Sequence, residues 1–554
     1  MKHLVRGILA ALLGLLSVVS QGAEPVPEKQ TPTPSTAPVL QRIVIAESPE
    51  QIVAIPPGSA ANFVVVADGL KFLNVAELNK KLLPARGQQV TERLLMAINQ
   101  LVEKYVRATE NPLAVAVIPP QNIENGTVKL ALTLGKFREI KFTGNRWYSE
   151  ALLRDKLHVG SGTQIRLSEL DQAINLTNNS PFRNLKANIE PIPGSNDAVL
   201  EVSVQERLPL RLTAMYDNSG NEVLGQNRVS ASATYANVWG REHQATYQLI
   251  TSNKSNIFAG HILEYNVPLP GQQSLSFSGS YLRARPKFYD GLFQQDGRNI
   301  SAEVRYTRLL RKEPHPIEGF AGLAFKESNN NLEFGGTQVL GTSADVFQVF
   351  TGASTVVRDS RGGWALSATV TASPGRINSR NSEAVFNEVR PGASPRYLVG
   401  VLSVQRSLRL NGGWDVFSRA MLQRSSTNLL PSESLSMGGA STVRGYVENT
   451  VSGDRGFFLS NEINAPAWTK PRMIAGKIGL NEARVLFFYD VASVGAKQRY
   501  ALDLPTNALA STGIGLRARF ANYFSLSADY GWQILHSTRT TDHGRCHIKV
   551  SAAY

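Results

Sequence analysis

Two short segments near the end of the chain hold residue types that could form a buried ion pair. Arg444 lies in the glycine-rich segment SLSMGGASTVRGY, residues 434–446, and Asp490 lies in FFYDVA, residues 487–492. A guanidinium can bind a carboxylate through two parallel hydrogen bonds, which fix its orientation as well as its position. The pair could therefore hold the loop that carries Arg444 against the strand that carries Asp490. The alternative is an exposed loop arginine without a fixed partner.

The strand that would carry Asp490 alternates along its length. One face holds Val485, Phe487, Tyr489 and Val491, and the other holds Leu486, Phe488 and Asp490. A carboxylate that points into lipid costs several kcal/mol, so Asp490 and Phe488 should face the interior if this strand crosses a membrane. Arg444 lies in a long segment, about 425–455, between predicted strands at 415–422 and 456–464. There Gly438, Gly439 and Gly445 let the backbone turn tightly.

The same alternation continues through the C-terminal two thirds of the chain. In residues 524–534 large apolar side chains alternate with Ser, Asp, Gly and Gln, and residues 548–554 repeat the pattern up to Tyr554. A soluble β-sandwich would also alternate. Strands of about 10 residues with aromatic residues near their ends are typical of a membrane β-barrel when a secretory signal precedes them in the chain. We predict about 16 antiparallel strands over 208–554, since only a closed barrel satisfies every backbone group in lipid without helices.

The N-terminus predicts secretion. Lys2, His3 and Arg6 precede an apolar run at 7–19, and small residues follow up to Ala23. The run is too short for the usual membrane helix of roughly 20 residues, so 1–23 is interpreted as a signal peptide. Residues 24–39 contain five prolines and are predicted to form an extended linker.

Residues 40–207 predict two small α+β domains, 40–136 and 137–207. An amphipathic helix is expected at 91–108, with strands at 113–118 and 127–134. The second domain should contain strands at 138–142, 185–192 and 198–205 and helices at 149–157 and 168–175. This pattern alone does not exclude generic α+β packing without an interaction role.

Composition argues against several other functions. The formal charge of +14 comes from scattered basic residues without an aromatic-basic cluster, which favours a cationic surface or lumen near anionic lipid over nucleic-acid binding. The single cysteine, Cys546, excludes an internal disulfide framework. The sequence contains no G-x-S-x-G, H-E-x-x-H or G-x-x-x-x-G-K-[ST] motif. We therefore predict neither an enzyme nor a cofactor or metal site.

At this point four segments resemble a known group, the two-partner secretion transporters of the Omp85 superfamily, which includes the haemolysin and filamentous-haemagglutinin exporters. IPPQNIENGTVKL (118–130) and FREIKFTGN (137–145) are similar to the end of the first POTRA domain and the start of the second. The segment 434–446 resembles loop six, with its Val443-Arg444-Gly445-Tyr446 core, and FYDVA (488–492) resembles its partner motif on a barrel strand. The resemblance implies a 16-stranded outer-membrane barrel, two periplasmic POTRA domains and an Arg444–Asp490 pair.

The resemblance also implies binding partners for this chain, and the chain departs from the family pattern at two places. A large secreted protein would be captured by the POTRA domains and exported, outer-membrane lipid would surround the barrel, and the barrel assembly machinery would read the strand ending at Tyr554. Ala492 stands where the family usually has glycine, and the proline-rich 24–39 does not resemble the pore-plugging helix of other members. The alternative functions are an assembly factor for outer-membrane proteins and a passive porin.

Overall fold

A computed structural model gives the arrangement of most of the chain. The residues that it describes are 38–48, 63–221, 223–253, 257–288, 293–334, 337–469, 472–474, 478–500, 507–521, 523–535 and 543–554. The predicted signal peptide, and all but the last two residues of the predicted linker, lie outside these ranges. Among the described residues no helix is long and apolar enough to cross a membrane.

The first α+β segment contains a four-stranded sheet in the order β2-β1-β4-β3. Its elements are β1 (Arg42–Ala46), β2 (Val64–Val66), α2 (Val75–Leu82), α3 (Glu92–Thr109), β3 (Val115–Val117) and β4 (Thr127–Thr133). β1 pairs in parallel with β2 and β4, and β3 pairs antiparallel with β4. The side chain of Thr91 accepts a hydrogen bond from the Leu94 N–H, which caps α3 and explains where the predicted helix begins. The helices and the sheet share one apolar core.

The second α+β segment repeats the scheme with one strand fewer. It contains β5 (Phe137–Thr143), α4 (Glu150–Leu157), α5 (Leu167–Thr177), β6 (Arg183–Pro191) and β7 (Ala198–Glu206). The sheet order is β5-β7-β6, so β7 is central and β5 and β6 are edges. These ranges confirm the helices and strands expected between 137 and 207 to within two residues at each end.

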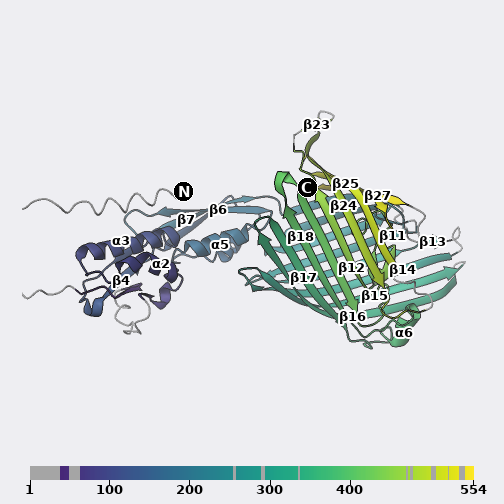
Figure 1. Cartoon of the computed structure of the whole chain (residues 1–554), viewed down its shortest axis with the longest axis horizontal. Helices are drawn as coiled ribbons and strands as arrows, with labels where there is room; N and C mark the ends of the chain where they lie inside the picture. Colours follow the sequence, from purple (N-terminus) through teal and green to yellow (C-terminus); the bar gives the residue numbers. More distant parts are fainter. Residues whose placement is uncertain are drawn as a thin grey trace, which may run out of the picture. The chain divides into compact units, whose positions relative to one another are not determined.

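A closed antiparallel barrel forms the rest of the chain (Figure 1). Within the described residues sixteen long strands close the barrel, which confirms the predicted architecture. They are β8 (Leu210–Asp217), β9 (Arg228–Val238), β10 (His243–Ser252), β11 (Phe258–Leu269), β12 (Gln273–Ala284), β14 (Phe293–Arg311), β15 (Ile317–Phe334), β16 (Thr337–Asp359), β17 (Gly362–Ser373), β18 (Tyr397–Arg409), β19 (Asp415–Ser425), β22 (Arg455–Asn464), β24 (Ile478–Gly495), β25 (Asn507–Phe520), β26 (Phe524–Gln533) and β27 (Gly544–Ala553). Two short strands, β13 (Lys287–Phe288) and β23 (Arg472–Ile474), pair with β14 and β24.

The barrel closes where the last strand meets the first. β27 pairs antiparallel with β8, from Lys549 opposite Asp217 to Ala553 opposite Thr213, and the Tyr554 N–H donates to the Leu212 carbonyl. We call the end of the barrel that holds Leu210 and Tyr554 the proximal end, and the opposite end the distal end.

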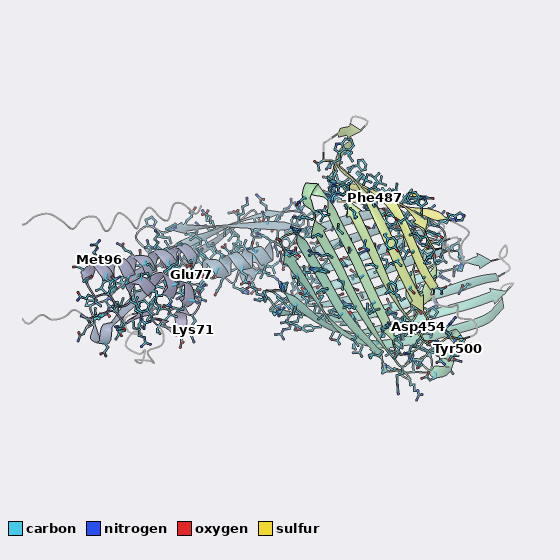
Figure 2. The ribbon with its side chains drawn as sticks, in the orientation of Figure 1. Lys71, Glu77, Met96, Asp454, Phe487 and Tyr500 are labelled. Carbon is cyan, nitrogen blue, oxygen red and sulfur yellow. The ribbon has the colours of Figure 1, made fainter. Side chains whose placement is uncertain are left out.

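Side chains alternate between the two faces of the barrel wall as the sequence predicts. On β24, Val485, Phe487 and Tyr489 are 46%, 53% and 45% exposed on the outside (Phe487 is labelled in Figure 2). The intervening Phe488 and Asp490 are 3% and 0% exposed, because they face the interior. The outer face of β24 is therefore apolar here, and its inner face carries a buried charged group.

Two distal loops fold over or into the barrel. The loop between β17 and β18 contains α6 (Glu383–Val389), which is capped by Ser382 and contacts β16. This helix lies outside the elements predicted from the sequence, because seven residues are too few for a helical period to be recognised. The loop between β19 and β22, residues 426–454, contains the hairpin of β20 (Leu435–Met437) and β21 (Val451–Gly453).

Candidate functional site

The loop between β19 and β22, called loop six below, packs its apolar side chains against the inner wall. Leu435, Met437, Val443, Tyr446 and Val451 form one buried cluster with the wall residues Phe458, Ala492, Val494 and Leu509. Ala492, which stands where the family pattern has glycine, is fully buried in this cluster, so its methyl group is accommodated. Apolar burial thus holds the body of loop six beside β22, β24 and β25.

Arg444 extends from loop six to the carboxylate of Asp490 on β24. Its Nε donates to Oδ2 over 2.7 Å and its Nη2 donates to Oδ1 over 2.9 Å, while its backbone N–H donates to Oδ2 over 3.1 Å. Arg444 is 2% exposed and Asp490 is fully buried. The structure therefore brings the two residues together in the bidentate geometry that holds both position and orientation.

A second carboxylate and a serine complete the polar shell of the guanidinium. Arg444 Nη1 donates to Glu462 Oε1 over 2.6 Å, and Ser460 Oγ donates to Asp490 Oδ1 over 2.6 Å. Both residues lie on β22, so the arginine connects loop six to two neighbouring wall strands. Charged groups that are removed from water are stable only when their hydrogen-bonding capacity is used in this way.

Phe488 supports the same guanidinium from one face. The Arg444 Cζ lies 3.6 Å from the centroid of the Phe488 ring, which is a close cation–π contact. Phe488 and Asp490 are two residues apart on one strand and so point to the same face. The alternation of β24 thus presents both an aromatic ring and a carboxylate to Arg444.

Gly445 contacts β26 and β27, the next strands of the wall beyond β25. Its N–H donates to His547 Nε2 over 3.1 Å, and its carbonyl accepts from Gln533 Nε2 over 2.8 Å. Its φ is +90°, and a Cβ placed there would lie 2.7 Å from the carbonyl oxygen of Gly531. Only glycine satisfies both the left-handed conformation and this contact between two backbones.

The remaining predicted residues position the tip of the loop. Gly438 and Gly439 have φ of +108° and +106°, in the region that favours glycine. Val443 is fully buried in the apolar cluster. The Tyr446 hydroxyl donates to the Ala510 carbonyl over 2.8 Å and also bonds the Leu535 carbonyl, which ties loop six to β25 and to the end of β26.

Asp454, labelled in Figure 2, ties three distal loops together near the base of loop six. Its carboxylate is fully buried and accepts from Arg390 Nη1 over 2.5 Å and Nη2 over 3.1 Å. It also accepts from the backbone N–H groups of Leu429 and Lys497, over 2.9 and 2.8 Å. This hub joins the loop that carries α6, loop six, and the loop after β24.

Several of these residues were missed by sequence reasoning. Ser460, Glu462, Gln533 and His547 contact loop six but belong to none of the motifs quoted above. Their positions on the inner face could have been read from strand alternation, yet alternation does not show which inner residues the loop reaches. Within the described residues no group of three or more His, Cys, Asp or Glu side chains is arranged to hold a metal ion.

The chain matches a known family over more than half of its length. Residues 196–518 match the model described as "Haemolysin secretion/activation protein ShlB/FhaC/HecB". An outer membrane transporter CdiB from Dickeya dadantii (strain 3937) is 24% identical over 366 residues, covering 64% of this chain and 63% of that protein. The hemolysin transporter protein ShlB from Serratia marcescens is 22% identical over 403 residues, covering 70% and 69%. The match to the Dickeya protein thus spans less than two thirds of that relative.

Solved structures show the same fold. CdiB from Escherichia coli aligns with a TM-score of 0.69 at 16% identity, covering 96% of this chain and 93% of that one. CdiB from Acinetobacter baumannii aligns with a TM-score of 0.63 at 17% identity, covering 99% and 96%. At these identities the likeness concerns the arrangement of the backbone.

Proposed function

Since the chain belongs to the haemolysin secretion/activation family ShlB/FhaC/HecB, which consists of two-partner secretion transporters of the Omp85 superfamily, we propose that it exports a large partner protein across the bacterial outer membrane. One observation carries the proposal most directly: loop six occupies the interior of a closed barrel and is held there by the buried Arg444–Asp490 pair. A loop held by a few specific contacts can move without unfolding the wall.

The barrel would be oriented with its proximal end toward the periplasm. β8 begins there directly after the two α+β segments, which would therefore lie in the periplasm as POTRA domains. Loop six, α6 and the Asp454 hub lie at the distal end and would face the outside. The outward side chains, such as Phe487 and Tyr489, would contact lipid, since large apolar groups exposed in this number are unsuited to water.

Loop six would act as the gate. Its apolar cluster and its hydrogen bonds from Arg444, Gly445 and Tyr446 attach it to β22, β24, β25, β26 and β27. Passage of a polypeptide requires this loop to leave part of the interior. The contacts are polar at the tip and rest on single side chains, so they can be exchanged one at a time as the partner enters.

The POTRA domains would capture the partner through exposed sheet edges. In the first domain β2 and β3 are the edge strands, and Val117 on β3 is 51% exposed. An extended segment can add to such an edge through main-chain hydrogen bonds, with side-chain pockets supplying selectivity. The sequence contains no nucleotide-binding motif, so folding of the partner outside the cell would supply the energy for export.

Membrane insertion of the transporter itself would depend on its last strand. β27 ends beside Tyr554, whose backbone pairs with Leu212 of the first strand at the proximal end. We propose that the barrel assembly machinery recognises this strand before the barrel closes.

Secretion of a candidate partner in a surrogate Gram-negative host tests the proposal. The full chain, the Arg444→Ala variant and a chain without residues 40–205 would each be co-expressed with the partner. We expect the native chain alone to deliver the partner to the medium, while Arg444→Ala still inserts as a heat-modifiable barrel. Arg484→Ala is the matched control, because Arg484 pairs with Asp415 between wall strands and touches no residue of loop six.

Other outcomes would point elsewhere. Normal export by Arg444→Ala would contradict the proposal that loop six acts as a latch. Ion conductance without secretion by the native chain would favour a passive porin, and loss of many outer-membrane proteins after deletion of the gene would favour an assembly factor.

A further inference from the structure

Outward-facing arginines stand at the distal ends of two neighbouring barrel strands. On β19 the outer face carries Leu422, 39% exposed, and then Arg424. On β22 it carries Phe457, 45% exposed, preceded by Arg455 at the start of the strand. Leu422 pairs with Phe457, and both arginines are exposed. Strand alternation therefore places the two guanidiniums on the lipid side of the wall, each two residues beyond a large apolar side chain.

The two arginines lie side by side between two glycines. Gln423 pairs with Gly456, so Arg424 and Arg455 occupy the next register position toward the distal end. Across the other edge of each strand, Arg424 pairs with Gly400 of β18, and Arg455 pairs with Gly495 of β24. A Cβ placed on Gly400 would have no neighbour within 4 Å. The outer surface here thus holds two adjacent cations, each with a glycine as its neighbour on the next strand, and we call this patch the shelf.

Neither arginine has an acidic partner among the described residues. No carboxylate there lies within ion-pair distance of Arg424 or Arg455, and two like charges on adjacent strands repel each other. Arg406 shows the contrast, because it also faces outward but pairs with Ser418, six positions from Arg424 toward the proximal end. Its Nη1 lies 2.5 Å from an Asp359 carboxylate oxygen, and its guanidinium lies 4.8 Å from the centre of the Trp364 ring. Arg424 and Arg455 are therefore available to bind an anion from outside the chain.

The shelf lies at the depth of the lipid head groups. Trp414, which directly precedes β19 and is 37% exposed, marks the proximal boundary of the apolar surface. Arg424 is ten positions further along the strand. With a rise of about 3.4 Å per residue and a tilt of about 40°, this separation corresponds to roughly 25 Å, the height of the apolar band of outer-membrane barrels. Arg424 thus stands where the wall leaves the hydrocarbon on the distal side.

Two further cations follow the distal ends of the neighbouring strands β18 and β24. Arg396 lies two positions beyond Leu398 on the β18 side, and Lys497 lies two positions beyond Gly495 on the β24 side. Both are exposed. Guanidinium groups bind phosphate through paired hydrogen bonds, and an ammonium adds a point charge. Two adjacent arginines with open space beside them suit a phosphate carried on a bulky sugar.

We infer that the shelf of Arg424 and Arg455, bounded by Gly400 and Gly495, binds the phosphorylated sugar head of the outer-leaflet glycolipid, lipid A. The site would anchor one lipid beside the strands that flank loop six, because β19 and β22 are the strands that this loop connects. The inference rests on the outer-membrane orientation proposed above and is independent of export.

Native mass spectrometry of the full chain in detergent tests the site. The probes are bisphosphorylated lipid A, the same lipid without phosphates, and inorganic phosphate. We expect the native chain to retain bisphosphorylated lipid A in preference to the dephosphorylated form, and Arg424→Gln/Arg455→Gln to weaken that binding about 30-fold. Arg406→Gln is the matched control and should bind as the native chain does.

Three results would overturn the inference. These are unchanged binding by the double variant, equal binding of the dephosphorylated lipid, or displacement of lipid A by inorganic phosphate at equal concentration, which would indicate a site for free anions. Heat-modifiable mobility reports whether each barrel is folded. If the double variant does not fold, Gly400→Phe provides a second test, because it fills the shelf with an outward apolar ring while leaving both arginines in place. Native affinity in that variant would likewise contradict the proposed site.

Discussion

Replacing Arg444 by lysine separates the charge of the latch from its geometry. In the native protein all three guanidinium nitrogens donate to carboxylates: two nitrogens donate to Asp490 and the third donates to Glu462. A lysine ammonium is a single point donor and cannot form the parallel pair of hydrogen bonds while also reaching Glu462. It also lacks the planar face that lies over Phe488. The variant keeps the buried positive charge, so neither carboxylate is left without a cation.

The expected effect follows from the lost contacts. Loss of one charged hydrogen bond costs about 1.5–3 kcal/mol, which corresponds to about a 10- to 100-fold shift of loop six toward the undocked state. Arg444→Ala removes the cation altogether. It should shift the same equilibrium further, by about 3–5 kcal/mol, because it leaves buried carboxylates unpaired.

Single-channel recording in planar bilayers measures this equilibrium directly. We expect Arg444→Lys to spend a larger fraction of time in high-conductance states than the native chain, and Arg444→Ala a larger fraction still. Arg484→Lys should behave as the native chain, since Arg484 connects wall strands at the proximal end. Native gating in Arg444→Lys would show that charge alone holds loop six. Native gating in Arg444→Ala would show that the apolar cluster holds it without the ion pair.

Two more predictions concern contacts that flank the latch. Gly445→Ala should undock loop six by about 1–3 kcal/mol, because φ is +90° and the new Cβ would meet the Gly531 backbone. Gly439→Ala shares the strained positive φ, but its Cβ meets the Glu448 side chain instead of a backbone, so it should perturb channel gating less. Asp454→Asn weakens the two hydrogen bonds that Arg390 donates to this side chain. Limited proteolysis of intact cells should therefore cut the loop that carries α6 faster, while export is retained. Equal cleavage rates would show that Asp454 does not hold that loop.

Strand alternation predicted the barrel and the inward direction of Asp490 and Phe488. The period of a strand is two whatever its neighbours are, so the face of each residue can be read from the sequence once the strand is recognised. The positive φ angles at Gly438, Gly439 and Gly445 likewise match the tight turns that the glycines indicate. The resemblance to loop six then favoured the Arg444–Asp490 pair over the alternative of an exposed loop arginine.

Other contacts could not be predicted because they depend on which strands the loop crosses. Glu462 lies 18 positions from Arg444, but Gln533 and His547 lie 88 and 102 positions from Gly445. Strand alternation shows that these side chains face inward, but it carries no information on the path of a loop through the interior. The buried Arg390–Asp454 pair was missed for the same reason, since it joins two irregular loops, whereas α6 is too short to show a helical period.

The sequence by itself determined the class of the molecule: its strand period, its sixteen-strand barrel, and the glycine-rich loop with an arginine opposite an inward aspartate. The strand period and the inward direction of Asp490 are local properties, set by the backbone and by the cost of placing a charge in lipid. Only the tertiary structure decided that the loop meets β22, β24, β25, β26 and β27 together, and that Arg424 and Arg455 stand side by side on the outer wall. Closure of the barrel brings residues far apart in the chain into register, and that register is a property of the whole sheet.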